Sequence, residues 1–240
     1  MILNFKKFHI YSASVIGIDK KNNQDAFGTV ETEDYLISVV ADGLGSAKHS
    51  KFGAKTAVLA VQKSCLEWKK LNNRKKEILI QLIHFYWNLY ISDSKYEKKE
   101  CLTTCLFLYI DKKEKNVFLG QLGDGLIYFK SDNIFFISSN NIDFNYTKAL
   151  GSSKNIKDWQ IYFEKLETNN LKCFMATDGV SDDIVENKEE EFLNVIIEKL
   201  KRVKFFQKNR NRILEEILQN WKTKYHSDDK TITVLWERGI

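Results

Sequence analysis

Three apolar, strand-like runs in this sequence end in an aspartate that is followed by glycine. Asp42 follows the run LISVVA, Asp178 follows CFMAT, and Asp124 lies within GQLGDG. The end of a rigid strand aims a side chain well, and glycine beside it permits a tight turn. Each corner alone is an ordinary turn signal. If folding brings the three together, their oxygens would make a site of the kind that Mg²⁺ and Mn²⁺ prefer.

Composition excludes several classes of protein. The chain has 240 residues, of which 43% are hydrophobic and 29% charged, as expected for a globular protein with a sizeable core. The net charge of +5 comes from Lys and Arg interleaved with Glu, which favours solvated helix faces over a nucleic-acid surface. The apolar stretch ILIQLIHFYWNLYI is too short to span a bilayer, and no secretory segment is visible.

The four cysteines form no C-x-x-C pair, so they predict neither a zinc site nor a redox motif. We expect Cys101 and Cys105 to lie on one strand, roughly 13 Å apart, which is too far for a disulfide. Unpaired cysteines are typical of a reducing compartment, and we therefore expect a cytoplasmic protein.

Hydrophobic periodicity predicts clustered strands and clustered helices. Alternation predicts strands in the first 41 residues, a meander of three or four strands within residues 102–138, two strands within 158–179 and a last one at 230–238. Helical spacing marks residues 49–70, 74–90, 189–206 and 209–226. Strands joined by short turns indicate antiparallel pairing, so we expect an α+β fold. No repeat or linker divides residues 1–240, which predicts a single domain.

Six segments carry a resemblance to a known family. In chain order they are KKNNQDAF, VVADGLGSAKHSKFGAKTAV, TTCLFLYI, LGQLGDGLIYF, FMATDGVSDDI and SDDKTITVLW. Together they resemble the motifs of the metal-dependent type 2C serine/threonine protein phosphatases, in particular a bacterial branch, over about residues 12–236. The resemblance implies a four-layer α-β-β-α sandwich, in which two packed antiparallel sheets are flanked by helices and a dimetal cleft lies at one end.

The resemblance also implies the metal ligands. Asp42 would bridge two Mn²⁺ or Mg²⁺ ions, the carbonyl of Gly43 would bind one of them, and Asp178 and Asp228 would hold the other. Asp228 is preferred to its neighbour because the segment DDKT matches the family pattern from that position.

Further acidic residues are implied with smaller roles. Asp25 would act through metal-bound water. Asp124 would contribute to a third, weaker metal site, and Asp182 would touch that site as well.

Two positions depart from the family pattern. Lys20 stands where an arginine usually grips the substrate phosphate, and a lysine offers a point charge in place of a bidentate fork. A phosphate-binding role and an ordinary surface position are about equally expected for it. Leu44 replaces a histidine that many members carry as a candidate general acid. His49 lies five residues further on, and we expect it to be a surface residue at a helix start.

The function implied is hydrolysis of phosphoserine and phosphothreonine in proteins by water that two metal ions activate, with Asp42, Asp178, Asp228 and Lys20 as the catalytic residues. We expect phosphorylated proteins as partners, opposition to a Ser/Thr kinase and a monomer, with no nucleic acid or membrane bound. Lys20 and Leu44 leave open a pseudophosphatase that serves as a binding or regulatory module. A basic nucleic-acid-binding domain is a third reading. The sequence also leaves open whether residues 189–225 form a substrate-selecting flap or outer packing.

Overall fold

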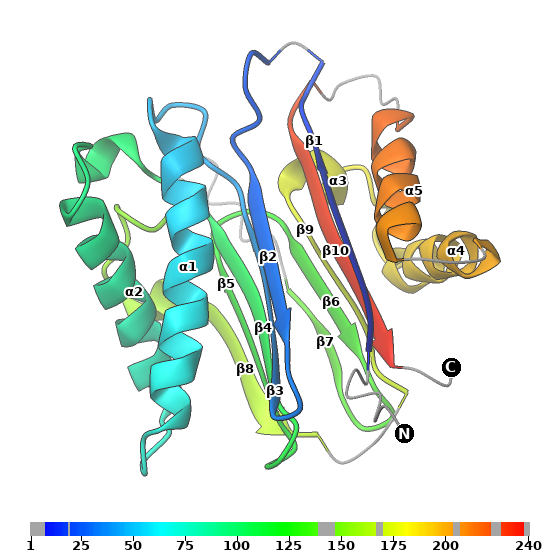
Figure 1. Cartoon of the computed structure of the whole chain (residues 1–240), viewed down its shortest axis with the longest axis horizontal. Helices are drawn as coiled ribbons and strands as arrows, with labels where there is room; N and C mark the ends of the chain where they lie inside the picture. The colour runs from blue at the N-terminus through cyan, green and yellow to red at the C-terminus, as the bar shows by residue number, and fades with distance from the viewer. Residues whose placement is uncertain are drawn as a thin grey trace.

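The computed structural model describes residues 8–18, 20–138, 147–166, 170–203, 207–221 and 227–237. Within these residues, strands form two five-stranded sheets in which every neighbouring pair with a defined register is antiparallel. The sheets lie against each other in the middle of the molecule, with helices on both outer sides (Figure 1). The α+β sandwich expected from the sequence is therefore confirmed.

Each sheet combines strands from distant parts of the chain. The first sheet has the order β2 (Ala26–Glu31), β3 (Tyr35–Ala41), β4 (Cys105–Asp111), β5 (Asn116–Leu122) and β8 (Gln160–Lys165). The second has the order β1 (Phe8–Val15), β10 (Lys230–Glu237), β9 (Lys172–Ala176), β6 (Leu126–Lys130) and β7 (Phe135–Ile137).

The central core lies between the two sheets. Leu36 and Leu106 of the first sheet belong to one buried cluster with Ile127, Met175 and Leu235 of the second. The strands β4 and β10 are buried along their whole length, since helices cover their other faces. Burial on both faces explains why their sequences read as nearly continuous apolar runs.

The helices form the two outer layers. α1 (Ser50–Lys69) and α2 (Lys76–Ser92) cover the first sheet, where Trp68 packs edge-on against Tyr109 and Phe118. α4 (Glu189–Arg202) and α5 (Gln207–Gln219) cover the second sheet, and the short α3 (Asp178–Ser181) follows β9. The 3-10 turns are η1 (Lys98–Glu100) and η2 (Ile156–Asp158). The described part of residues 189–225 therefore packs on the outer face of the second sheet.

The pairing of strands departs from chain order in three places, one of which corrects the meander expected within residues 102–138. β1 pairs with β10 and not with β2, and the chain crosses from one sheet to the other between β5 and β6 and again between β8 and β9. The crossing after β5 uses Gly123 and Gly125, whose φ angles of 86° and 112° favour glycine. The expected meander is thus split between the sheets, because strand periodicity and turn length do not distinguish a hairpin from a crossing.

The cysteines confirm one expectation and correct another. All four are free and buried. However, β4 begins at Cys105, so Cys101 does not share its strand and instead follows η1. His84 of α2 is half-buried: the indole of Trp159 donates a hydrogen bond to its Nε2, and burial lowers the pKa of His84 to about 4. No described helix is long and apolar enough to cross a membrane.

Candidate active site

Four aspartates are brought together where the two sheets meet at one end of the sandwich. Asp25 precedes β2 and Asp42 follows β3 in the first sheet, whereas Asp178 follows β9 and Asp228 precedes β10 in the second. In Figure 1 this is the upper end of the sheets, where β10 begins and α3 lies. The four residues, called the carboxylate cluster below, act on one another electrostatically.

Burial and mutual repulsion disfavour the charged forms of these carboxyl groups. Burial raises the pKa of Asp42 well above its usual range, and the negative charges of Asp25 and Asp228 add to the effect. Burial likewise raises the pKa of Asp178 to about 8, with contributions from Asp42, Asp228 and Asp182. The cluster is therefore an unfavourable place for four ionised carboxylates in the metal-free protein, where protonation of Asp42 and Asp178 relieves the repulsion.

Asp25 is the most enclosed member of the cluster. Its Oδ2 accepts a 2.9 Å hydrogen bond from the hydroxyl of Thr177, whereas its Oδ1 is buried without a hydrogen-bond partner. Burial raises the pKa of Asp25 to about 6, although hydrogen bonds involving Asp42, Thr231 and Thr177 oppose this shift. A buried, unpartnered carboxylate oxygen is costly unless a cation or a donor satisfies it.

Two threonines that sequence reasoning left without a role fix the backbone of Asp42. Its N–H donates to Thr104 Oγ1 over 2.9 Å, and its carbonyl accepts from Thr103 Oγ1 over 2.7 Å. The next residue must be small, because a Cβ on Gly43 would lie 2.8 Å from the carbonyl oxygen of Gln24. Both threonines belong to the segment TTCLFLYI, which carries the family resemblance but does not predict their contacts with Asp42.

The structure separates the roles of the two adjacent aspartates, Asp228 and Asp229. The Asp229 carboxylate is buried and accepts backbone hydrogen bonds of 2.8 Å from both Gly17 and Gln24, so it ties the β1–β2 connection to the start of β10. Asp228 is half-buried, and its carboxylate forms an ion pair with Lys20. The carboxylate of Asp229 is thus already used structurally, and Asp228 stays the predicted ligand of the pair.

Lys20 lies against the cluster. Besides the ion pair with Asp228, its Nζ lies 3.6 Å from Asp229 Oδ2. Burial lowers the pKa of Lys20, but the hydrogen bond and the charge of Asp228, with the charges of Asp229 and Asp42, outweigh burial and raise it overall. Lys20 is therefore a charged residue of the site and not an isolated surface lysine.

The other candidate residues are Asp124, Asp182, Leu44 and His49, and each has a different contact. Asp124 sits at the crossing between β5 and β6, where its Oδ2 accepts a 2.7 Å hydrogen bond from Thr147. Asp182 acts on Asp178 through its charge. Leu44 donates its N–H to the carbonyl of Leu102. His49 is half-buried at the start of α1, where its ring stacks on Tyr96 with centroids 4.0 Å apart. The last histidine, His226, lies outside the described residues.

The donor chemistry of the cluster fits a hard divalent cation. All of its donors are oxygens, its carboxyl groups repel one another when ionised, and Asp25 Oδ1 has no hydrogen-bond partner among the described residues. Among the described residues, however, no three His, Cys, Asp or Glu side chains already surround a common point as metal ligands would. Asp228 is instead held by Lys20. A cation would therefore have to compete with this ion pair.

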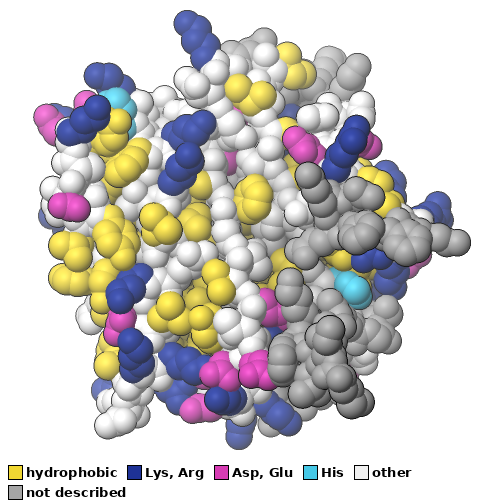
Figure 2. All heavy atoms as spheres, in the orientation of Figure 1, with side chains coloured by type: hydrophobic (Ala, Val, Ile, Leu, Met, Phe, Trp, Pro, Cys, Tyr) yellow, Lys and Arg dark blue, Asp and Glu magenta, His cyan; other side chains and the backbone are white. Residues whose placement is uncertain are grey.

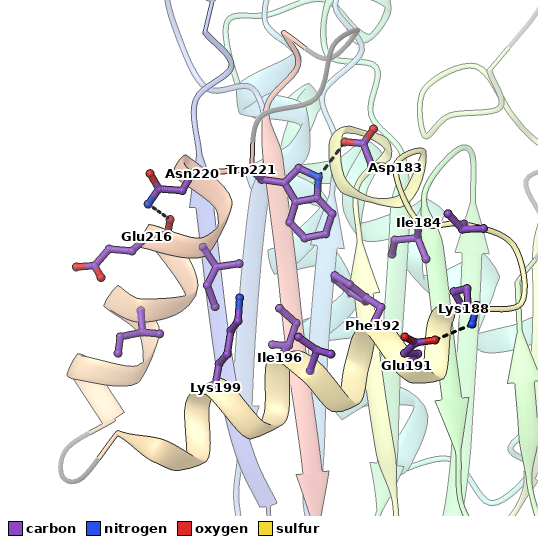
Figure 3. Close-up of a pocket in the computed structure, with 14 residues that line it drawn as sticks. Asp183, Ile184, Lys188, Glu191, Phe192, Ile196, Lys199, Glu216, Asn220 and Trp221 are labelled. Atoms are coloured by element: carbon purple, nitrogen blue, oxygen red, sulfur yellow. Dashed lines mark hydrogen bonds and ion pairs between the residues drawn. The ribbon is translucent and has the colours of Figure 1, made fainter.

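A separate pocket of about 760 Å³ lies in the outer layer between α4 and α5 (Figure 3). Its lining includes Phe192, Ile196, Ile213 and Trp221, and the indole of Trp221 donates to Asp183 Oδ2 over 3.1 Å. None of the four clustered carboxylates lines it. This pocket is therefore not the place where the candidate ligands converge.

Comparison with known proteins identifies the family. The family model described as protein phosphatase 2C matches residues 18–221. The chain belongs to the protein phosphatase 2C family. No curated protein sequence matches it significantly.

Solved structures of this family share the fold at low sequence identity. RsbX in complex with magnesium is 16% identical, with a TM-score of 0.60 over 95% of this chain and 94% of that chain. The serine/threonine phosphatase of S. agalactiae is 14% identical, with a TM-score of 0.64 over 96% and 99%. Stp1 from Staphylococcus aureus is 15% identical, with a TM-score of 0.64 over 97% and 95%.

The contacts of Asp229 predict a large effect on stability. Asp229→Ala should lower the free energy of unfolding by about 2–4 kcal/mol, because it leaves the buried N–H groups of Gly17 and Gln24 without their acceptor. The neighbouring Asp228→Ala should change it by less than about 1 kcal/mol, since it removes a partly exposed ion pair. Urea denaturation of the metal-free proteins measures both. Equal losses would contradict the separate roles.

The raised pKa of Asp178 predicts a pH-dependent stability of the metal-free protein. A carboxyl group whose pKa is raised on folding stabilises the fold while protonated, and this contribution is lost as the pH rises towards about 8. In EDTA, the stability of Asp178→Asn relative to the wild type should therefore increase between pH 5 and pH 8 by at least about 1 kcal/mol. Melting curves at the two pH values test this, and a pH-independent difference would refute it.

Proposed function

We propose that the protein hydrolyses phosphoserine and phosphothreonine in proteins and depends on Mn²⁺ or Mg²⁺ for this reaction. The observation that carries the proposal is the carboxylate cluster: four aspartates from both sheets share one largely buried, acidic end of the sandwich. Membership of the protein phosphatase 2C family supports the same reaction. We further propose that residues 1–240 form a single domain for this purpose.

The candidate ligands follow from the cluster. Asp42, Asp178 and Asp228, with the carbonyl of Gly43, would hold two ions, and Asp25 would orient their water ligands from behind. Asp124 is the candidate ligand for a third ion. Its Oδ2 accepts a hydrogen bond from Thr147, which would have to break if this oxygen were to bind an ion. When bound, the ions supply Lewis-acid activation of water and of the phosphoryl group.

The chain's own residues would position the substrate and the ligands. Thr177 holds Asp25, and Thr103 with Thr104 holds the backbone of Asp42, so both carboxylates are oriented before substrate arrives. Asp229 anchors the connection that carries Lys20. The Lys20 ammonium, which pairs with Asp228 in this structure, would bind the substrate phosphate as a point charge.

A second candidate function is a pseudophosphatase that binds phosphorylated segments without turnover. The ion pair between Lys20 and Asp228 favours it, because a lysine already neutralises one candidate ligand. Titration calorimetry with Mn²⁺ separates the two functions, since tight binding of ions without phosphate release supports the pseudophosphatase. The opposing kinase, the monomeric state and the cytoplasmic location stay predictions.

Removal of a candidate ligand should abolish activity. With Mn²⁺ and a phosphothreonine peptide, Asp42→Asn or Asp178→Asn should lower kcat/KM by on the order of 10²-fold or more, because each removes an anionic ligand oxygen. Asp93→Asn is the matched control, since Asp93 is exposed at the end of α2. Phosphate release and melting curves are the readouts. Wild-type protein that releases no phosphate, or variants that keep full activity, would disprove the proposal.

Lys20 should contribute through its charge. Lys20→Met should raise KM for a phosphothreonine peptide and lower kcat/KM about tenfold, because the ammonium beside Asp228 is lost. Lys20→Arg retains the charge and should recover most of the loss. Steady-state kinetics at fixed Mn²⁺ distinguish the variants. A Lys20→Met enzyme with unchanged kinetics would show that Lys20 serves only the metal-free form.

A further inference from the structure

A basic groove opens beside the carboxylate cluster. Its volume is about 650 Å³, and five lysines line it: Lys20, Lys21, Lys48, Lys51 and Lys55. No Asp or Glu is among the described residues that line it. Several Lys and Arg side chains are visible over the upper part of α1 in Figure 2.

Four of these lysines have no acidic partner within the described part of the chain. Lys21, Lys48, Lys51 and Lys55 are exposed, and none forms an ion pair with the described residues. Further along the same helix, Lys63 pairs with Glu67, as expected for a solvated helix face. A concave surface with one sign of charge raises the local concentration of ligands of the opposite sign.

The groove is continuous with the carboxylate cluster through Lys20. This lysine lines the groove and also contacts Asp228. Gln24 lines it as well and immediately precedes Asp25 in the chain. A ligand with its phosphoryl group at the cluster would therefore place its neighbouring residues along the lysines.

The spacing of the lysines suits a peptide. Lys51 and Lys55 are one turn apart on α1, about 6 Å, which an extended peptide covers in about two residues. The aromatic rings in the groove suit a nucleic acid less well. His49 and Tyr96 stack on each other, so one face of each ring is already occupied and no open base-stacking platform remains between them.

We propose that this groove binds anionic side chains that flank the phosphorylated residue, so that the preferred substrates are acidic or multiply phosphorylated segments. This specificity rests on the proposed phosphatase function. The groove contributes by charge complementarity, with Lys51 and Lys55 as specificity-determining residues and Lys20 as the link to the reacting phosphate.

The test compares phosphothreonine peptides that differ only in their flanks: glutamates, glutamines, or a second phosphoserine. The variant Lys51→Gln/Lys55→Gln removes two groove charges from exposed positions. Lys75→Gln/Lys76→Gln removes two charges at the start of α2, next to the C-terminal end of α1, where Trp68 contacts the carbonyl of Lys75. Trp68 lies about 20–25 Å along α1 from Lys51 and Lys55, so the control is remote from the groove.

We expect wild-type enzyme to prefer an anionic flank to glutamine by about tenfold in kcat/KM at low salt. Lys51→Gln/Lys55→Gln should abolish this ratio, whereas Lys75→Gln/Lys76→Gln should retain it. A preference for glutamate identifies carboxylates as the ligands, and one for phosphoserine alone identifies a second phosphate; both support the groove. Equal rates for all flanks, or a ratio that survives Lys51→Gln/Lys55→Gln, would overturn it.

Two further measurements separate this specificity from the reaction itself. Hydrolysis of para-nitrophenyl phosphate by wild-type protein tests the phosphatase activity without a flank. If wild-type protein does not hydrolyse para-nitrophenyl phosphate, fluorescence anisotropy of the labelled glutamate-flanked peptide still measures binding to the groove. A loss of affinity in Lys51→Gln/Lys55→Gln then supports the proposed groove. Single-stranded RNA that binds more tightly than every peptide, with a loss in the same variant, would assign the groove to nucleic acid and refute the proposal.

Discussion

Repulsion between buried carboxylates is the constraint on which the rest of the structure depends. Burial and neighbouring negative charges raise the free-energy cost of ionising the clustered carboxyl groups of Asp25, Asp42 and Asp178. A flexible chain would lower this cost by moving the carboxyl groups apart. They stay together because each follows or precedes a strand whose other residues lie in a packed core. The sandwich thus supplies the stability that its acidic end lacks, as active sites commonly require.

The packing of the two sheets sets the geometry of the site. Asp25 and Asp42 adjoin strands of the first sheet, and Asp178 and Asp228 adjoin strands of the second. Hydrogen bonds join the halves across this boundary: Thr177 at the end of the second sheet donates to Asp25, and Asp229 accepts from the backbone N–H of Gln24 before β2. A close approach reinforces the second sheet's end, since a Cβ on Gly179 would lie 2.0 Å from the carbonyl oxygen of Asp229. A change in the packing between the two sheets would therefore alter the distances between the clustered aspartates.

The sequence predicted the elements better than their partners. The strand and helix segments were evident because apolar periodicity is a local property, and β10 or α4 could be outlined from it. The pairing of β1 with β10 and the crossing after β5 depend on contacts between residues far apart in the chain, which periodicity does not encode. The candidate ligands came from the order of motifs. Their supports, Thr103 and Thr177, were missed because a threonine beside a motif has no distinctive pattern.

The lysines of α1 show how an average over the chain conceals a local charge. Lys and Glu alternate in much of the sequence, which favoured solvated faces throughout, yet α1 carries no acidic residue before Glu67. Lys51 and Lys55 therefore face the groove without compensation. Lys20 lines this basic groove and also pairs with Asp228, so it lies at the boundary between the groove and the carboxylate cluster. Under the proposed function, an anionic substrate would gain from both only if a bound cation offset the negative charge of the ionised cluster, so cation binding and substrate binding would depend on each other.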